Sequence, residues 1–265
     1  MDPVYIMAVL ALAVLFAMRR QALFDIHWRP TGSTWAAIAA AFAIFGVSLL
    51  LTQPWLGRTA KQLLLHGGLY VLLGVWFPLY WTRRIERRGL DALGFHRRNL
   101  PVSLVVNLAL GLFLGTVMAL SADWSAIAPG TFLAALFVLL TGNFFELVFY
   151  YGFVHLRLRD AFGPLPAIFG TSFLYVLWHT GTELMLVDHP LAAAGFLFVV
   201  GILFQSVFAM TYNLAIIFPF FVGAGVMLDF TVNISALEQV APYAGWSALA
   251  WVLFALGFVL WGRRA

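Results

Sequence analysis

The sequence contains no cysteine and little charge. None of its 265 residues is a cysteine, which excludes a disulfide framework, a thiolate metal site and a cysteine nucleophile. Charged residues make up only 10% of the chain, whereas 63% of it is hydrophobic and the mean hydropathy is +0.95. This composition is too apolar for a water-soluble domain with a polar shell. The sequence therefore predicts an integral membrane protein.

The chain also lacks a Gly/Ser linker, a low-complexity tract and an internal repeat, and its longest polar segment runs only from Arg83 to Asn99. No separate soluble domain is expected. The formal net charge of +4 does not indicate a nucleic-acid partner, because the basic residues stand in short clusters at the ends of apolar runs, where they set topology. The partners expected from composition are membrane lipids and no nucleic acid.

Long apolar runs predict an all-α, polytopic membrane protein. A bilayer-spanning helix needs ~20 mostly apolar residues, and the first run lacks the flanks of a cleaved signal peptide, so it is expected to be a retained span. Nine spans are predicted, and eight are the alternative because the division at Tyr212 is open. The nine runs are approximately 3–18, 35–52, 63–82, 101–120, 131–153, 165–187, 191–211, 213–233 and 246–261.

Basic residues fall mainly on one side of these nine spans. With the N-terminus outside, only Arg58 and Lys61 of the fifteen basic residues are external. The positive-inside rule therefore predicts N-out and C-in, in a plasma membrane that we expect to be bacterial or archaeal. The basic residues assigned to the cytoplasmic side are Arg19, Arg20, Arg29, Arg83, Arg84, Arg87, Arg88, Arg97, Arg98, Arg157, Arg159, Arg263 and Arg264.

A glutamate interrupts the fifth predicted span. Placing a charge near the middle of a bilayer costs ~2.5–3.5 kcal/mol on insertion scales, so Glu146 needs a reason to be there. Asn143 and Tyr150 stand three residues before and four after it, on one helix face, and are predicted to form a polar strip with it. The alternative is a protonated glutamate that only hydrogen-bonds a neighbouring helix.

Two later spans carry further polar groups. His179 lies in the sixth span with Glu183 at i+4, and Asp229 lies in the eighth with Asn233 at i+4. Each has a plainer interpretation, since a lone histidine is often a packing residue and the Asp229 pair is near the outer interface. Together with the glutamate, these groups predict a site that polarises water.

Two chemistries fit such a site. In the first, Glu146 is a general base and the histidine stabilises the developing charge. In the second, Glu146, His179 and Asp229 hold a divalent metal such as zinc, which generates hydroxide. The residues by themselves do not choose between the two chemistries.

The stretch Glu146-Leu-Val-Phe-Tyr-Tyr-Gly-Phe153, followed by Leu156–Ala167 and by Phe173-Leu-Tyr-Val-Leu-Trp-His179, resembles the CPBP family of CAAX-prenyl-protease-like and bacteriocin-processing (Abi) membrane proteins. The family pattern is Glu-Glu-x-x-x-Arg, a basic turn rich in Gly and Pro, an aromatic-x-x-x-His motif and a final His-x-x-x-Asn/Asp motif. The resemblance covers about residues 89–235. It implies a CPBP-like helical core at 101–235, preceded by N-terminal helices and a basic loop at 1–100 and followed by a C-terminal helix at 236–265.

The resemblance assigns Glu146 to the first glutamate of the family and Tyr175 to His179 to the second motif. It implies that the glutamate activates water and that the histidine stabilises the oxyanion or binds a metal. The last motif is represented by Asp229-Phe-Thr-Val-Asn233, in which Asp229 takes the histidine position and Asn233 is kept.

The chain departs from the family pattern at three positions. Leu147 replaces the second glutamate, Tyr151 replaces the arginine, and the histidine of the last motif has no counterpart, since Asp229 stands in its place. These departures favour a catalytically degenerate member of the family. Three functions therefore stay open: an intramembrane endopeptidase acting on a membrane-associated peptide or protein, a catalytically degenerate scaffold or partner protein, and a transporter or proton pathway. The lack of a repeat pair and of matched interrupted spans counts against the transporter.

Overall fold

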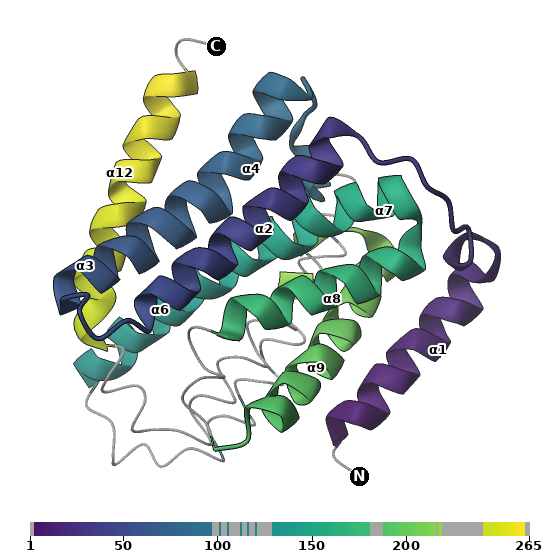
Figure 1. The fold of residues 1–265 in the computed structure, drawn as a ribbon, viewed down its shortest axis with the longest axis horizontal. Helices are drawn as coiled ribbons and strands as arrows, with labels where there is room; N and C mark the ends of the chain where they lie inside the picture. The colour runs from purple at the N-terminus through teal and green to yellow at the C-terminus, as the bar shows by residue number, and fades with distance from the viewer. Residues whose placement is uncertain are drawn as a thin grey trace.

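The computed structural model describes residues 3–96, 129–180, 188–215, 217–218 and 241–262. It also describes Pro101, Val105, Leu112, Thr116 and Leu120. Within these residues every regular element is a helix (Figure 1), which confirms the all-α prediction for this part of the chain. Glu183, Asp229 and Asn233 lie outside the described residues.

Residues 3–96 form two separate helices and one long composite helix. Helix α1 is Pro3–Leu23 and α2 is Gly32–Leu51. Thr31 begins α2 with a capping box, because its hydroxyl accepts from the Thr34 backbone while Thr34 bonds back. The composite helix consists of α3 (Arg58–Gln62), η1 (Leu63–Trp76), α4 (Phe77–Tyr80) and η2 (Trp81–Ile85), and a single 3-10 turn, η3 (Leu90–Leu93), follows it.

The second half contains another composite helix at the centre of the molecule. It consists of α6 (Pro129–Glu146), η6 (Leu147–His155) and α7 (Leu156–Phe162). The remaining elements are α8 (Pro164–Thr180), α9 (Pro190–Thr211), the 3-10 turn η8 (Ala241–Tyr243) and α12 (Ala244–Gly262). Proline stands at or next to the start of α6, α8 and α9, where its missing N–H leaves no helical bond unmade.

Four helices in the described part of the chain are long and apolar enough to cross a membrane, which agrees with an integral membrane protein. They are Gly32–Leu51, Arg58–Ile85, Gly130–Phe162 and Pro190–Thr211. Shorter apolar stretches occupy Tyr5–Met18 and Ala244–Gly257. The predicted spans at 101–120 and 213–233, and the end of 165–187, fall largely outside the described residues, so the count of nine stays a prediction. The division at Tyr212 is a helix end, because α9 stops at Thr211 and Tyr212 has a φ of 53°.

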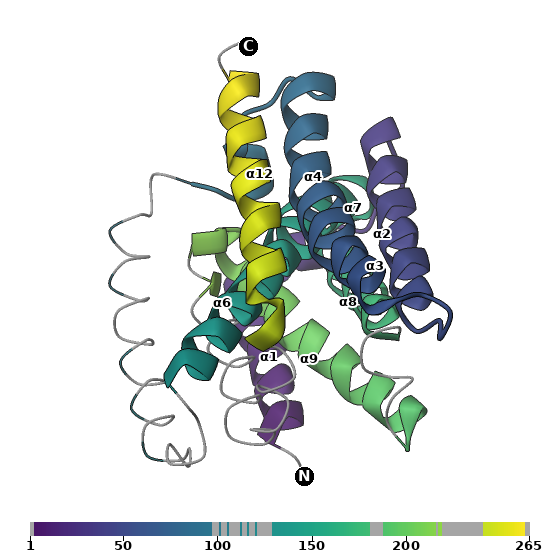
Figure 2. The ribbon, with the colours of Figure 1, turned by 90° about the vertical axis from the view of Figure 1, so that its left-hand side faces the viewer.

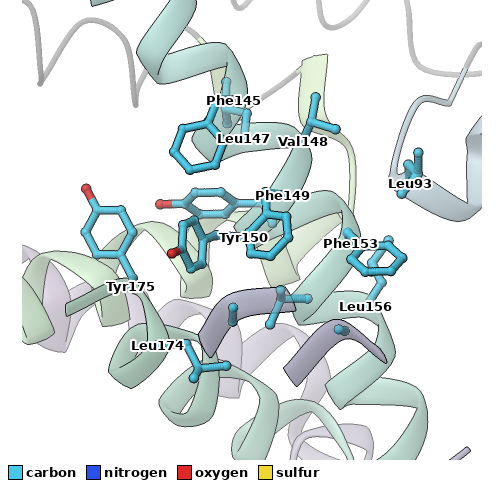
Figure 3. Packing of buried hydrophobic residues seen from close by; sticks show 14 of the residues in the cluster. Leu93, Phe145, Leu147, Val148, Phe149, Tyr150, Phe153, Leu156, Leu174 and Tyr175 are labelled. Carbon is cyan, nitrogen blue, oxygen red and sulfur yellow. The ribbon is translucent and has the colours of Figure 1, made fainter. Parts of the chain in front are cut away.

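The central composite helix packs against most of the other elements. Helix α8 contacts α9, α2 and α7, while η1 contacts α2, α6 and α12, and α1 packs on α9 (Figures 1 and 2). The largest apolar cluster surrounds η6, where Phe145, Phe149 and Phe153 follow one another along the helix and Tyr175 approaches from α8 (Figure 3). This core places the end of α6 beside α8.

A tight turn joins α7 to α8 and explains how α8 folds back. Gly163 has a φ of +97°, and a Cβ there would collide with the backbone of Asp25. The chain before α2 is bonded to the same turn, since the Arg29 N–H donates to the Ala161 carbonyl at 2.8 Å. Glycine is needed at position 163 for both its conformation and this close approach.

Candidate functional site

Glu146 is the last residue of α6 and is 9% exposed. The nine residues that follow it form η6, a π-helix with one more residue in each hydrogen-bonded turn than an α-helix. Such segments are rare and often occur at functional sites. The glutamate therefore stands at a change of helical geometry, deep in the packed centre.

Three side chains of α8 surround the carboxylate. The Trp178 indole N–H donates to Glu146 Oε1 at 2.8 Å, and the Tyr175 hydroxyl donates to Oε2 at 3.4 Å. His179 Nε2 lies 3.7 Å from Oε1. All three α8 residues are buried, with exposed fractions of 3–6%. The structure thus brings Glu146 of α6 and His179 of α8 together. Trp178 donates to the carboxylate oxygen that lies nearest to His179.

The other nitrogen of His179 determines which tautomer the neutral ring adopts. Nδ1 lies 2.9 Å from the carbonyl oxygen of Tyr175, one turn earlier. A carbonyl only accepts, so Nδ1 carries a hydrogen and donates it. Nε2 then bears a proton only when the ring is an imidazolium. The proton at Nε2 therefore decides whether His179 and Glu146 form an ion pair.

Aromatic rings enclose the carboxylate. Tyr70 of η1 stacks on Phe145 with ring centroids 5.1 Å apart, and Phe145 meets Trp178 edge to face at 5.5 Å. On the opposite side, Tyr150 packs edge to face on Tyr175 at 5.7 Å. Rings at these separations exclude bulk water, and a site of low polarity strengthens the electrostatic contacts inside it.

The predicted polar strip is replaced by other contacts. Asn143 donates its amide N–H to the Leu139 carbonyl at 2.8 Å, in the preceding turn of its own helix. The Tyr150 hydroxyl has no hydrogen-bond partner among the described residues, and its ring packs against Tyr175. Two donors to the carboxylate, Tyr175 and Trp178, come from α8, because tertiary packing places that helix against the end of α6.

The proposed metal chemistry has two ligands in the described part of the chain. Glu146 and His179 are close together, but no group of three histidine, aspartate, glutamate or cysteine residues that could hold a metal occurs among the described residues. Catalytic zinc takes three protein ligands as a rule. Asp229, the third predicted ligand, lies outside those residues, so the metal site stays a prediction.

Sequence reasoning missed the roles of Trp178 on α8 and of Arg157 on α7. The spacing of Tyr175, Trp178 and His179 on α8 places all three on one face, which is a signal that could have identified the indole as a donor. Arg157 was assigned to topology, but it is 4% exposed and forms an ion pair with Glu86. A count of basic residues cannot distinguish a buried, paired arginine from an exposed arginine in a cytoplasmic loop.

Comparisons with protein-family models, with curated proteins and with solved structures find no match to the chain.

Proposed function

We propose that the chain is an intramembrane endopeptidase of the CPBP type, in which Glu146 activates water and His179 stabilises the charge that develops. The observation that carries the proposal is the pair formed by Glu146 and His179, 3.7 Å apart and buried between two helices. This distance is too long for a direct hydrogen bond but lies within the range of an ion pair. Burial of both groups is costly unless they interact.

The proposed chemistry follows from the protonation of the pair. With Glu146 as carboxylate and His179 as imidazolium, the two charges compensate each other inside the helix packing. Glu146 takes a proton from water while the water oxygen attacks the carbonyl carbon of the scissile peptide bond. His179 Nε2–H donates to the oxyanion. The C–N bond then breaks, and the proton passes from Glu146 to the leaving amine.

Trp178 has a positioning role in this scheme. Its indole N–H donates to Oε1 at 2.8 Å, which restricts the rotation of the carboxylate. A general base must lie within hydrogen-bond reach of the proton that it removes, and a fixed carboxylate meets this requirement better than a rotating one.

A catalytically degenerate scaffold is the second candidate, and a specific observation favours it. Leu147 and Tyr151, which stand at the family's second glutamate and arginine positions, are 2% and 0% exposed in the main apolar cluster. Both side chains therefore contribute to the packing of the apolar core. A chain kept only for packing would tolerate the loss of the Glu146 carboxylate charge.

Terminal peptide mapping of the membrane proteome separates these two functions. Cells that carry the wild-type chain are compared with cells that carry Glu146→Gln, which keeps the shape of the side chain but cannot act as a base. Asp160→Asn, at an exposed carboxylate, is the matched control. We expect neo-termini that disappear with Glu146→Gln and persist with Asp160→Asn. Identical peptide maps for all three chains, at equal protein levels, would support the scaffold.

The same assay tests the third predicted group. If Asp229 takes the histidine position of the family motif, Asp229→Ala abolishes the cleavage while the protein still folds, because water can fill a polar site. Asp229→His is then tolerated, since imidazole is a good ligand for zinc-like ions. Unchanged cleavage in both variants would remove Asp229 from the site.

A further inference from the structure

A row of polar side chains lies on one face of the first composite helix. Gln62, His66 and Tyr70 follow one another at intervals of four residues in an otherwise apolar segment, so they share one side of the helix. Gln62 is 7% exposed and His66 is 0% exposed. The mechanism proposed for Glu146 uses none of these three residues.

His66 is the unusual member of the row. Neither ring nitrogen has a hydrogen-bond partner among the described residues. Its nearest rings are Tyr70, with centroids 5.4 Å apart, and Tyr243 at 6.4 Å. A neutral imidazole has one donor and one acceptor, and buried polar atoms in proteins bond to protein groups or to ordered water with few exceptions. The environment of His66 therefore favours water as its partner.

The inner end of the row reaches the Glu146 site. Tyr70 stacks on Phe145 and lies edge to face with Trp178, with ring centroids 6.2 Å apart. A Cβ at Gly142 would lie 3.4 Å from the Tyr70 hydroxyl, so the glycine leaves space beside that oxygen. Trp178 in turn donates to Glu146. The row thus ends at the indole that positions the carboxylate.

The outer end of the row reaches the start of the same composite helix. Arg58 is exposed there, and its guanidinium lies over the Tyr243 ring at 5.5 Å from the centroid. Tyr243 also faces His66. A continuous set of polar and aromatic groups therefore connects an exposed cation to the buried site.

We propose that ordered water occupies the row formed by Gln62, His66 and Tyr70 and reaches Glu146 from the end of the molecule where Arg58 lies. His66 holds this water through its two ring nitrogens. The inference deepens the proposed function, because hydrolysis at a site enclosed by aromatic rings consumes water that must arrive by a polar path. The path itself requires no catalysis.

Single cysteines test the path directly, since the chain has no cysteine of its own. His66→Cys and Gln62→Cys are labelled with N-ethylmaleimide in membrane vesicles and compared with Leu69→Cys, a fully buried position on the same helix. The thiolate is the reactive form and needs hydration, so we expect both row positions to react at least about tenfold faster than Leu69→Cys. Pretreatment with a charged, membrane-impermeant thiol reagent on the Arg58 side should block both row positions.

A second measurement uses the unchanged protein and does not depend on the folding of a variant. Radiolysis of water oxidises side chains that lie beside bound water, and mass spectrometry locates the modified residues. After correction for intrinsic reactivity, we expect His66 and Tyr70 to be oxidised more than Phe149, which is fully buried in the apolar core.

The two proposals can fail separately. Row cysteines as slow as Leu69→Cys, together with His66 no more oxidised than Phe149, would overturn the water path whatever the enzymatic result. Labelled row cysteines in a protein whose Glu146→Gln variant leaves the peptide map unchanged would retain the path and reject the endopeptidase.

Discussion

At the scale of single residues, the Glu146 carboxylate is stabilised by groups that lie far from it in the sequence. The indole N–H of Trp178, 32 residues away in the sequence, donates to it at 2.8 Å. A charge-assisted hydrogen bond of this kind is worth more than a neutral one, and a buried carboxylate that loses its donor bears the full cost of desolvation. Trp178 is therefore expected to matter for stability as well as for the site.

Replacing Trp178 by phenylalanine keeps a ring against Phe145 but removes the donor. We expect the free energy of unfolding to fall by about 1–3 kcal/mol, the usual cost of an unsatisfied buried polar group, and any Glu146-dependent cleavage to fall as well. Denaturant titration in detergent measures the stability. Trp35→Phe, at a residue that is 53% exposed, is the matched control and should stay within about 0.5 kcal/mol of the wild type.

At the scale of elements, a buried arginine joins three separate segments. Arg157 of α7 pairs with Glu86, just beyond η2, and its Nε–H donates to Oε1 at 3.1 Å. The same guanidinium donates to the Ala92 carbonyl in η3 at 2.8 Å and to the Thr82 hydroxyl at 2.7 Å. Both partners of the ion pair are shielded from solvent, so each depends on the other.

A double-mutant cycle tests this junction. Arg157→Met leaves the Glu86 carboxylate buried and uncompensated, and we expect it to lower the free energy of unfolding by about 3–5 kcal/mol. Adding Glu86→Gln should restore part of that loss, because the uncompensated charge is then gone. Arg159→Met, at a more exposed neighbour paired with Asp160, should cost about 1 kcal/mol or less. Additive losses in the double variant would contradict the coupling.

At the scale of the whole molecule, the start of the first helix and the end of the last helix lie at opposite ends of the ribbon. Helix α1 begins at the lower end of the ribbon and α12 ends at the upper end in both views (Figures 1 and 2). The exposed Arg83, Arg84, Arg87 and Arg88 lie at the end of the composite helix opposite to Arg58. The positive-inside rule predicts that the end with these four arginines faces the cytoplasm.

Reporter fusions check this topology. Fusions after Ala161 and after Ala265 should read as cytoplasmic, and a fusion after Asp123 should read as external, because the basic clusters stay on the side of synthesis. A fusion after Arg88 should give the same reading as the fusion after Ala161. Readings at Ala161 and Asp123 that are the reverse of these would refute the N-out orientation.

The sequence by itself determined the class of the protein and the approximate positions of its helices. Apolar runs predicted at 35–52, 63–82 and 191–211 correspond to the helices Gly32–Leu51, Arg58–Ile85 and Pro190–Thr211. These helices can be predicted from sequence because a chain in lipid must form its backbone hydrogen bonds within each helix. A helix that crosses the bilayer also needs a long run of apolar residues. The rarity of charge also made Glu146 and His179 conspicuous.

Only the tertiary structure decided which groups meet. Two contacts join residues that are distant in the sequence: Glu146 with Trp178, and Arg157 with Glu86. The row of Gln62 and His66 lies on one helix, and its surroundings depend on the neighbours of that helix. Hydropathy does not identify interaction partners, so the sequence alone placed Arg157 among the cytoplasmic basic residues and did not single out His66. The role of a buried polar side chain depends on the hydrogen-bond donor or acceptor beside it, and tertiary packing determines which group that is.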